Sequence, residues 1–233
     1  MSGRLLLLFL LSLGVSQFAA CGGSDRTQKQ RFNYSKTEDY APVKPHRDAG
    51  GMMIAGTNTS ESIRQLKSIN GQSITNLEAL MRPGNQDERS SKDGFLGANE
   101  SLIEVMIADN DYVTERGLTH RELAIPLLQI SNRAMKLVDV KQRVWTVDFE
   151  YAGTNWRVEM KVYSGFQFSP FTDGTKTNED FEITNLDNAS TLRFSGLVPI
   201  MIERYGFYEG HETPYRVDPS DIIRVLELNI TEH

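Results

Sequence analysis

Residues 143–163 hold the pattern that most restricts how this chain can fold. Apolar and aromatic side chains alternate with polar ones from Arg143 to Tyr151 and again from Asn155 to Tyr163, with Ala152-Gly153-Thr154 between the two arms. One face of the arms carries Trp145, Val147, Phe149 and Tyr151 together with Trp156, Val158, Met160 and Val162. Alternation with a period of two, interrupted by a short turn that contains Gly, predicts a β-hairpin with one apolar and one solvated face.

The segment after the hairpin predicts the rest of a sheet. Two further strands are expected at 181–184 and 191–194, with 172–180 as a polar connection that leads into them. The apolar run at 222–226 follows Asp218-Pro219 and fits either a short helix or a last strand. The sequence therefore predicts about four strands, largely antiparallel.

Four segments before the hairpin have the pattern of amphipathic helices. They begin at residues that are common N-caps, namely Ser60, Ser73, Ser101 and Thr119. Pro126 lies inside the last segment, and we expect a kink or a break there. N-terminal helices packed on the sheet give a single α+β domain at 60–233, with a helical part at 60–140 and a sheet part at 141–233.

The first 24 residues have the features of a secretory signal that ends at a lipid attachment site. Arg4 precedes an apolar run from Leu5 to Val15, and small residues lead up to Cys21, the one Cys of the chain. The run Phe18-Ala19-Ala20-Cys21 resembles the lipobox of bacterial lipoproteins, with Phe18 where that family prefers Leu. The resemblance implies a signal peptide at 1–20 and fatty acyl chains, such as palmitate, on Cys21. Because no Asp follows Cys21, the resemblance also implies that the protein is attached to the outer membrane and faces the periplasm. The alternative is ordinary secretory cleavage near an incidental Cys.

Residues 21–59 are expected to form a flexible, lipid-anchored tether. The segment is rich in Gly, Ser, Lys, Asp and Thr, contains Pro42 and Pro45, and lacks a sustained apolar period. Such a segment buries too little apolar surface to offset the entropy lost on ordering.

Charge and cysteine content exclude some classes of partner and site. The chain has 25 Lys and Arg against 31 Asp and Glu, a net charge of −6, which is not the basic balance of a nucleic-acid-binding protein. A single Cys cannot form an intramolecular disulfide, and no Cys and His residues have zinc-site spacing. We therefore expect no nucleic acid, no metal and no cofactor.

The stretch 197–216 places aromatic and basic side chains in what is expected to be a loop. Pro199 favours a short helix that runs to about Tyr205 and ends at Gly206. Aromatic residues with polar tips, together with Arg, are typical of interfaces and ligand clefts. The candidate binding surface consists of Tyr205, Tyr208, His211, Tyr215 and Arg216. The alternative is that these rings close the open end of the sheet, with hydroxyls hydrogen-bonded at the rim.

Catalytic motifs are absent from the sequence. It contains no Gly-x-Ser-x-Gly, Ser-x-x-Lys, His-Glu-x-x-His or P-loop pattern. A hydrolase would have to combine His120 or His211 with a carboxylate, for which the candidates are Glu122, Asp148 and Glu212. Asp109-Asn110-Asp111 lacks the Gly and the distal Glu of an EF-hand and predicts a turn between helices.

These observations favour a lipid-anchored bacterial cell-envelope protein with a non-catalytic binding or assembly role. Its expected partners are the membrane, through acyl chains on Cys21, and an envelope protein. Two alternatives are a periplasm-facing hydrolase without a recognisable motif and a lipoprotein that binds a small ligand between sheet and helices.

Overall fold

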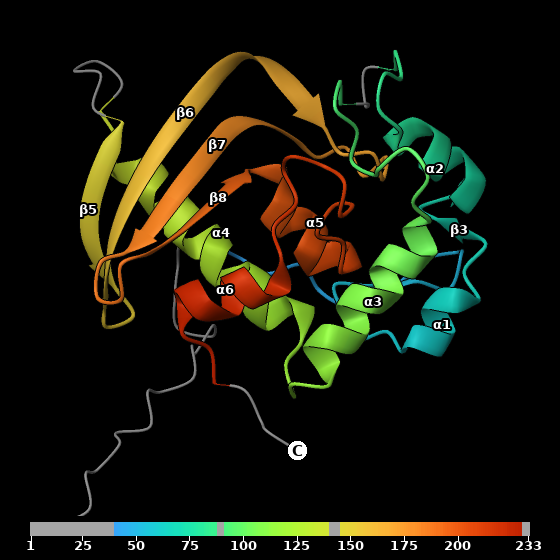
Figure 1. Ribbon diagram of the computed structural model, residues 1–233, viewed down its shortest axis with the longest axis horizontal. Coiled ribbons are helices and arrows are strands. Elements are labelled where there is room, and N and C mark those ends of the chain that lie inside the picture. Colours follow the sequence, from blue (N-terminus) through green and yellow to red (C-terminus); the bar gives the residue numbers. More distant parts are fainter. Residues whose placement is uncertain (1–39, 88–90, 140–144, 230–233) are drawn as a thin grey trace, which may run out of the picture.

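The computed structural model describes residues 40–87, 91–139 and 145–229 (Figure 1). The predicted signal peptide at 1–20 and the predicted lipidation site Cys21 lie outside the described residues. The helices are α1 (Ser60–Arg64), α2 (Ile74–Met81), α3 (Leu102–Thr114), α4 (His120–Leu137), α5 (Leu197–Tyr205) and α6 (Pro219–Leu226). The strands are β1 (His46–Arg47), β2 (Met53–Ile54), β3 (Ser68–Ile69), β4 (Gln72–Ser73), β5 (Thr146–Tyr151), β6 (Thr154–Phe168), β7 (Lys176–Asn185) and β8 (Ser190–Ser195).

The main sheet is antiparallel and has the strand order β5-β6-β7-β8. Its first hairpin is closed by Ala152 and Gly153, whose φ angles of 55° and 78° both lie in the left-handed region. Two residues of that conformation give the type I′ turn, whose twist matches that of the flanking strands. The predicted α+β class and the four-stranded antiparallel sheet are confirmed.

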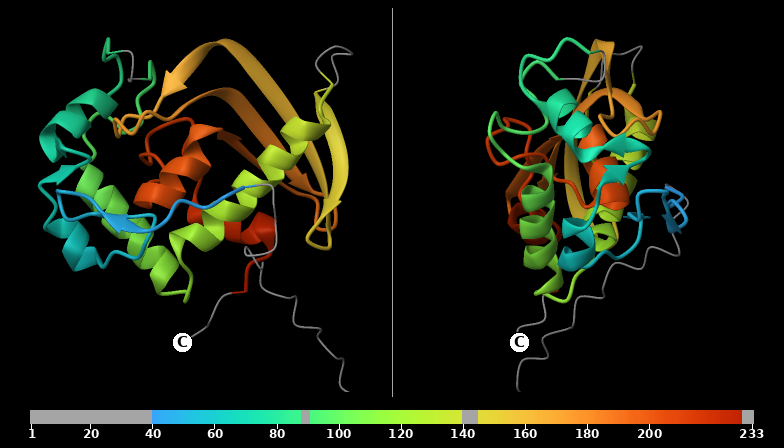
Figure 2. Two further views of the ribbon diagram at one scale, coloured as in Figure 1. Left: turned by 180° about the vertical axis from the view of Figure 1, so that it is seen from behind. Right: turned by 90° about the vertical axis from the view of Figure 1, so that its right-hand side faces the viewer.

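Helices cover one face of this sheet, which arches over α4, α5 and α6 (Figures 1 and 2). Trp156, Val158 and Met160 of β6 point into the shared core and are buried, as the alternation predicts. The helices α1, α2 and α3 stack beside one another at one side of the molecule (Figure 1). Of the helices in the N-terminal half, α4 covers the sheet. The two C-terminal helices, α5 and α6, cover it as well.

The structure overturns one local prediction and decides between alternatives at two other places. Helix α4 runs without a break through Pro126, after a capping box in which Thr119 and Glu122 satisfy each other's backbone N–H groups. Asp109, Asn110 and Asp111 lie inside α3 and not in a turn, because their side chains bind neighbouring elements instead of their own backbone. Residues 222–226, for which the sequence allowed either a helix or a strand, belong to helix α6, which begins at Pro219.

The segment 40–55, called the strap here, packs on the helices although the sequence predicts a tether through residue 59. The Tyr40 hydroxyl donates to Glu203 Oε2 at 2.5 Å, and the Val43 N–H donates to Glu203 Oε1 at 2.9 Å. Arg121 donates to the carbonyl oxygens of Val43 and Ala55 at 2.8 and 2.7 Å. Since Glu203 is buried, these contacts satisfy a carboxylate in the interior and fix the strap. Residues 40–59 therefore belong to the folded domain.

Strand β6 is longer than predicted and is irregular near its end. Its pairing with β7 shifts register between Val162 and Gln167, and Val162, the last residue before the shift, is exposed. Strand β7 begins at Lys176, within the segment predicted to be a connection. A bulge increases local twist and redirects side chains.

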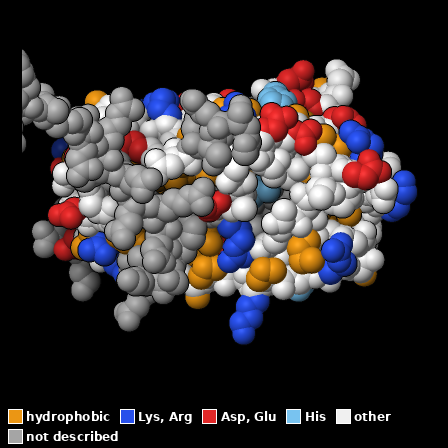
Figure 3. All heavy atoms as spheres, turned by 90° about the horizontal axis from the view of Figure 1, so that it is seen from below, with side chains coloured by type: hydrophobic (Ala, Val, Ile, Leu, Met, Phe, Trp, Pro, Cys, Tyr) orange, Lys and Arg blue, Asp and Glu red, His pale blue; other side chains and the backbone are white. Residues whose placement is uncertain are grey.

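The described helices and surface complete the picture. None of the helices in the described ranges combines the length and the apolar character needed to cross a bilayer. On the face shown in Figure 3, acidic and basic side chains occur among uncharged ones.

Candidate functional site

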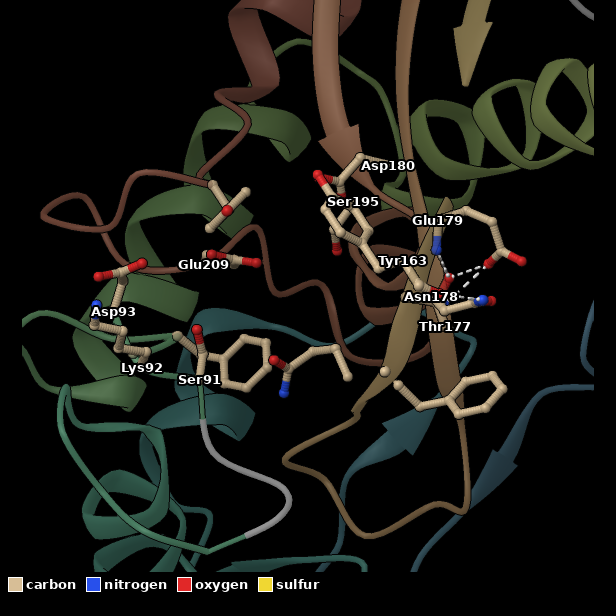
Figure 4. A pocket seen from close by; sticks show the side chains of 16 residues that line it. Ser91, Lys92, Asp93, Tyr163, Thr177, Asn178, Glu179, Asp180, Ser195 and Glu209 are labelled. Carbon is tan, nitrogen blue, oxygen red and sulfur yellow. Dashed lines mark hydrogen bonds between the residues drawn. The ribbon is translucent and has the colours of Figure 1, made fainter. Parts of the chain in front are cut away.

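A cleft of about 340 Å³ opens at the irregular end of β6. One wall comes from the loop between α2 and α3, at 91–95, and from Glu209 in the loop between α5 and α6. The other wall comes from the ends of β6 and β7, including Tyr163, Phe166 and residues 177–180. Figure 4 shows Lys92, Asp93 and Glu209 on one side and Tyr163, Asn178 and Glu179 on the other. Three chain segments that are distant in sequence thus meet here.

Glu209 combines three unfavourable features in one residue. Its backbone has φ 69°, in the left-handed region that residues with a Cβ adopt at a cost of roughly 1–2 kcal/mol. Its carboxyl lines the cleft, yet the residue is only 2% exposed. The pKa of this carboxyl is raised to about 8, chiefly by burial and to a small extent by the nearby Asp180, while Thr213 and Arg216 act in the opposite direction. Strain and a shifted pKa together are typical of functional sites.

The hydrogen bonds of Glu209 fit a protonated acid. Thr213 Oγ1 lies 3.2 Å from Glu209 Oε2 and 2.9 Å from the carbonyl oxygen of Gly210. A hydroxyl has one proton and can donate to only one of these oxygens at a time. When Glu209 is protonated, its own O–H can donate to Thr213, which leaves the Thr213 proton for Gly210. Among the described residues, Thr213 is the one hydrogen-bond partner of this carboxyl, and it contacts Oε2, so Oε1 keeps its acceptor capacity for a ligand.

Two charged side chains hold the Glu209 loop in place. Arg216 donates to both oxygens of Asp109, at 2.6 and 3.1 Å, and to the carbonyl oxygen of Glu209 at 2.6 Å. Glu100 accepts from the backbone N–H groups of Gly97 and His211, at 2.7 and 2.8 Å. Glu100 thereby joins the α2–α3 loop to the Glu209 loop. The cleft wall is built from braced backbone and not from free side chains.

The opposite wall offers exposed rings and one open carboxylate oxygen. Tyr163 and Phe166 are 50% and 53% exposed, and Tyr215, at the cleft edge, is 43% exposed. The Tyr163 hydroxyl donates to Asp180 Oδ2 at 2.9 Å, while Oδ1 receives no hydrogen bond from the described residues. Glu179, by contrast, accepts from Thr177 and from the Asn178 N–H (Figure 4). Asp180 and Glu209 thus each keep one carboxyl oxygen without a donor among the described residues, and they lie on opposite walls.

The five residues of the predicted binding surface do not share one surface. Tyr205 is buried, stacks on Phe171 at 4.0 Å and donates to Asp173 at 2.9 Å. Tyr208 is also buried. The Arg216 side chain is 6% exposed and serves the brace described above. His211 and Tyr215 are exposed, and Tyr215 lines the cleft.

Three of the five residues proposed for a hydrolase, His120, Glu122 and Asp148, have structural partners. The ring nitrogens of His120 lie 2.9 Å from the Tyr208 hydroxyl and 3.2 Å from Asn110 Oδ1, and burial lowers its pKa to about 4. Glu122 caps α4, and Asp148 pairs with Arg157 at 2.7 Å on the open face of the sheet. His211 and Glu212 are exposed beside the cleft. His120 is thus a neutral, half-buried residue, held between two hydrogen-bond partners.

Sequence reasoning missed most of the cleft. Glu209 lies inside the stretch 197–216 but has no distinctive pattern, because its role depends on burial and on a positive φ angle. Residues 177–180 are polar and resemble a connection, although they belong to β7. One usable signal was the pair of neighbouring rings at Tyr163 and Phe166 around Ser164-Gly165, where the alternation of the hairpin ends.

Comparisons were made with protein-family models, with curated proteins and with solved structures. None of the three finds a match to this chain. The function has to be argued from the chemistry of the cleft.

Proposed function

We propose that this chain is a lipid-anchored protein of the bacterial envelope that binds a ligand in the cleft without transforming it. The observation that carries the proposal is Glu209, a strained and buried carboxyl whose free oxygen lines a cavity. A fold retains such a residue at a cost in stability, which a binding role would explain. The lipobox resemblance at Cys21 supports the location at the envelope, with the outer membrane facing the periplasm as the preferred site.

The cleft suits an elongated ligand. A second hollow of about 180 Å³ adjoins it and shares Tyr163, Asp180 and Tyr215. This hollow continues over the open face of the sheet, past Glu159 and Arg193. A ligand anchored near Glu209 could therefore extend along the strands. Ligand cavities of about 300–1,000 Å³ are usual, which places the cleft at the small end of that range.

Replacing Cys21 tests the location. We expect Cys21→Ser to release the protein from the membrane fraction and to abolish labelling with radioactive palmitate, because two or more acyl chains are needed for stable attachment. The matched control is Ser35→Ala, which should stay membrane-bound and labelled. Unchanged fractionation and labelling of Cys21→Ser would remove the anchor from the proposal.

Native mass spectrometry of protein extracted from its own envelope tests the cleft. We expect the wild-type protein to carry the additional mass of a bound ligand and the Phe166→Ala variant to lose that mass. The exposed ring of Phe166 forms part of the cleft wall but does not support the core, so its removal should affect binding and not folding. His211→Ala is the control, since His211 is exposed but does not line the cleft. If His211→Ala loses the bound ligand and Phe166→Ala retains it, the binding surface predicted from the sequence would be favoured over the cleft.

A hydrolase is the second candidate, and one observation favours it. A protonated Glu209 and a hydrogen-bonded Asp180 line the same cleft, and two carboxyl groups in different environments can act as general acid and base. A product mass in place of an intact ligand, lost in Glu209→Gln, would identify turnover and would contradict a purely binding role.

A further inference from the structure

The charges around the cleft restrict what its ligand can carry. The groups that face Glu209 come from every element around it: Tyr215 and Arg216 from its own loop, Lys92 and Asp93 from the α2–α3 loop, Glu179 and Asp180 from β7, and Tyr163 from β6. Among the basic groups of the described residues, Arg216 is already neutralised by Asp109, and Lys176 lies against the Phe166 ring at the rim. Lys92 and Lys176 therefore stand against four carboxyl groups, counting Glu209. The field in the cleft favours a cation.

The aromatic rim favours an organic cation in particular. Ring faces attract ammonium groups through their quadrupole, and such contacts contribute about 0.5–2 kcal/mol. The chain itself uses this chemistry at the rim, where Lys176 Nζ lies 4.4 Å from the centre of the Phe166 ring. Tyr163 and Tyr215 offer two more exposed rings at the same opening.

We propose that the ligand of the cleft carries a protonated amino group, which binds between Glu209 and Asp180 and against the rings of the rim. An ammonium group has three N–H donors. Glu209 Oε1 and Asp180 Oδ1 are acceptors without donors among the described residues, and they come from opposite walls. The inference rests on the proposed function, because it assigns a ligand class to the same cleft.

Binding of such a group must be linked to the protonation of Glu209. Burial raises the pKa of Glu209 to about 8, so the carboxyl is mostly neutral at pH 6.5. An ammonium beside it favours the ionised form, so the amine displaces a proton and affinity rises as pH rises toward and above 8. An alkyl amine with a pKa near 10.4 stays protonated across this range.

Three ligands of equal length and different charge test the proposal. We would titrate the full chain with n-butylamine, 1-butanol and butyrate at matched ionic strength, and follow backbone amide shifts by NMR at pH 6.5 and pH 8.5. We expect n-butylamine to bind roughly tenfold more tightly than 1-butanol at pH 8.5, which corresponds to about 1.4 kcal/mol. Affinity for n-butylamine should fall several-fold at pH 6.5, whereas that for 1-butanol should not change.

Two variants assign the effect to the cleft. Glu209→Gln should remove the pH dependence and most of the preference for the amine, and Asp180→Asn should weaken amine binding at both pH values. Glu212→Gln, an exposed carboxamide substitution in the same loop, should leave both properties intact. A spectrum of each variant in the absence of ligand shows that it is folded.

Several results would overturn the proposal. These are equal affinity for n-butylamine and 1-butanol, amine binding that is independent of pH in the wild type, and a preference that persists in Glu209→Gln. Stronger perturbation of the same amides by CaCl₂ would identify a metal site instead. If n-butylamine does not bind, but the Phe166→Ala variant still loses the mass of a ligand extracted from the envelope, the cleft remains a binding site for a ligand of another class. If both fail, the proposed function fails as well.

Discussion

Arg216→Met is expected to lower the free energy of unfolding by about 3–5 kcal/mol. The guanidinium of Arg216 and the carboxylate of Asp109 form a paired contact at 2.6 Å, and their side chains are only 6% and 4% exposed. Without Arg216, burial leaves Asp109 with no compensating charge, and burial already raises the pKa of Asp109 against the effect of Arg216. Urea denaturation at pH 7 measures the loss.

A double variant separates the ion pair from the general effect of substitution. Asp109→Leu combined with Arg216→Met should recover much of the lost stability, since an apolar pair of similar volume avoids the unpaired charge. Arg224→Met is the surface control, because its pair with Asp221 is about half exposed and contributes about 1 kcal/mol at most. Equal effects of Arg216→Met and Arg224→Met would show that the buried pair is not important for stability. Loss of ligand binding in an Arg216 variant is not evidence of a direct contact, since Arg216 braces the Glu209 loop.

Glu209→Gln is expected to stabilise the protein in alkaline solution and to change little at pH 5. The folded-state pKa of Glu209 is raised from 4.5 to about 8, so the folded state binds more protons than the unfolded state between these values. The stabilisation from the neutral acid is complete below pH 4.5 and is lost as pH rises through 8. A shift of this size corresponds to a loss of stability of about 5 kcal/mol, and the amide of the Glu209→Gln variant, which does not ionise, avoids this loss.

Urea denaturation of both proteins at pH 5, 7 and 9 measures this difference. The His120 contribution runs the other way, because its lowered pKa removes stability as pH falls from 6.5 toward 4. It is common to both proteins and cancels in the comparison. The exposed Glu212→Gln variant should follow the wild type at every pH. A constant difference between Glu209→Gln and wild type from pH 5 to pH 9 would contradict a buried neutral acid.

The sheet could be predicted because its pattern is local. Alternation along two arms and a Gly-containing turn fix the pairing of β5 with β6, and the buried Trp156, Val158 and Met160 follow from it. The prediction fails at Val162, where the bulge begins. Alternation cannot show where a strand extends beyond the helices that cover it, because that limit depends on tertiary packing.

The cleft could not be predicted because its residues acquire their properties from distant segments. Glu209 is unusual through burial, a positive φ angle and the brace formed by Arg216 with Asp109. None of these has a sequence pattern. Tyr205 and Tyr208 were selected for their polar rings, but the same hydroxyls are satisfied inside the core by Asp173 and His120. A polar ring in a loop is thus equally compatible with a surface and with a hydrogen-bonded interior.

The strap also determines the order in which the fold can be completed during synthesis. Tyr40 and Val43 bind Glu203 across 163 and 160 residues of chain. The first folded segment to emerge from the ribosome, or from a secretion channel, therefore waits for α5, which is among the last. Contacts of such long sequence separation slow folding and leave the intermediate open to proteases and to aggregation until they form. The strap is consequently expected to be completed late, after α5 has been made.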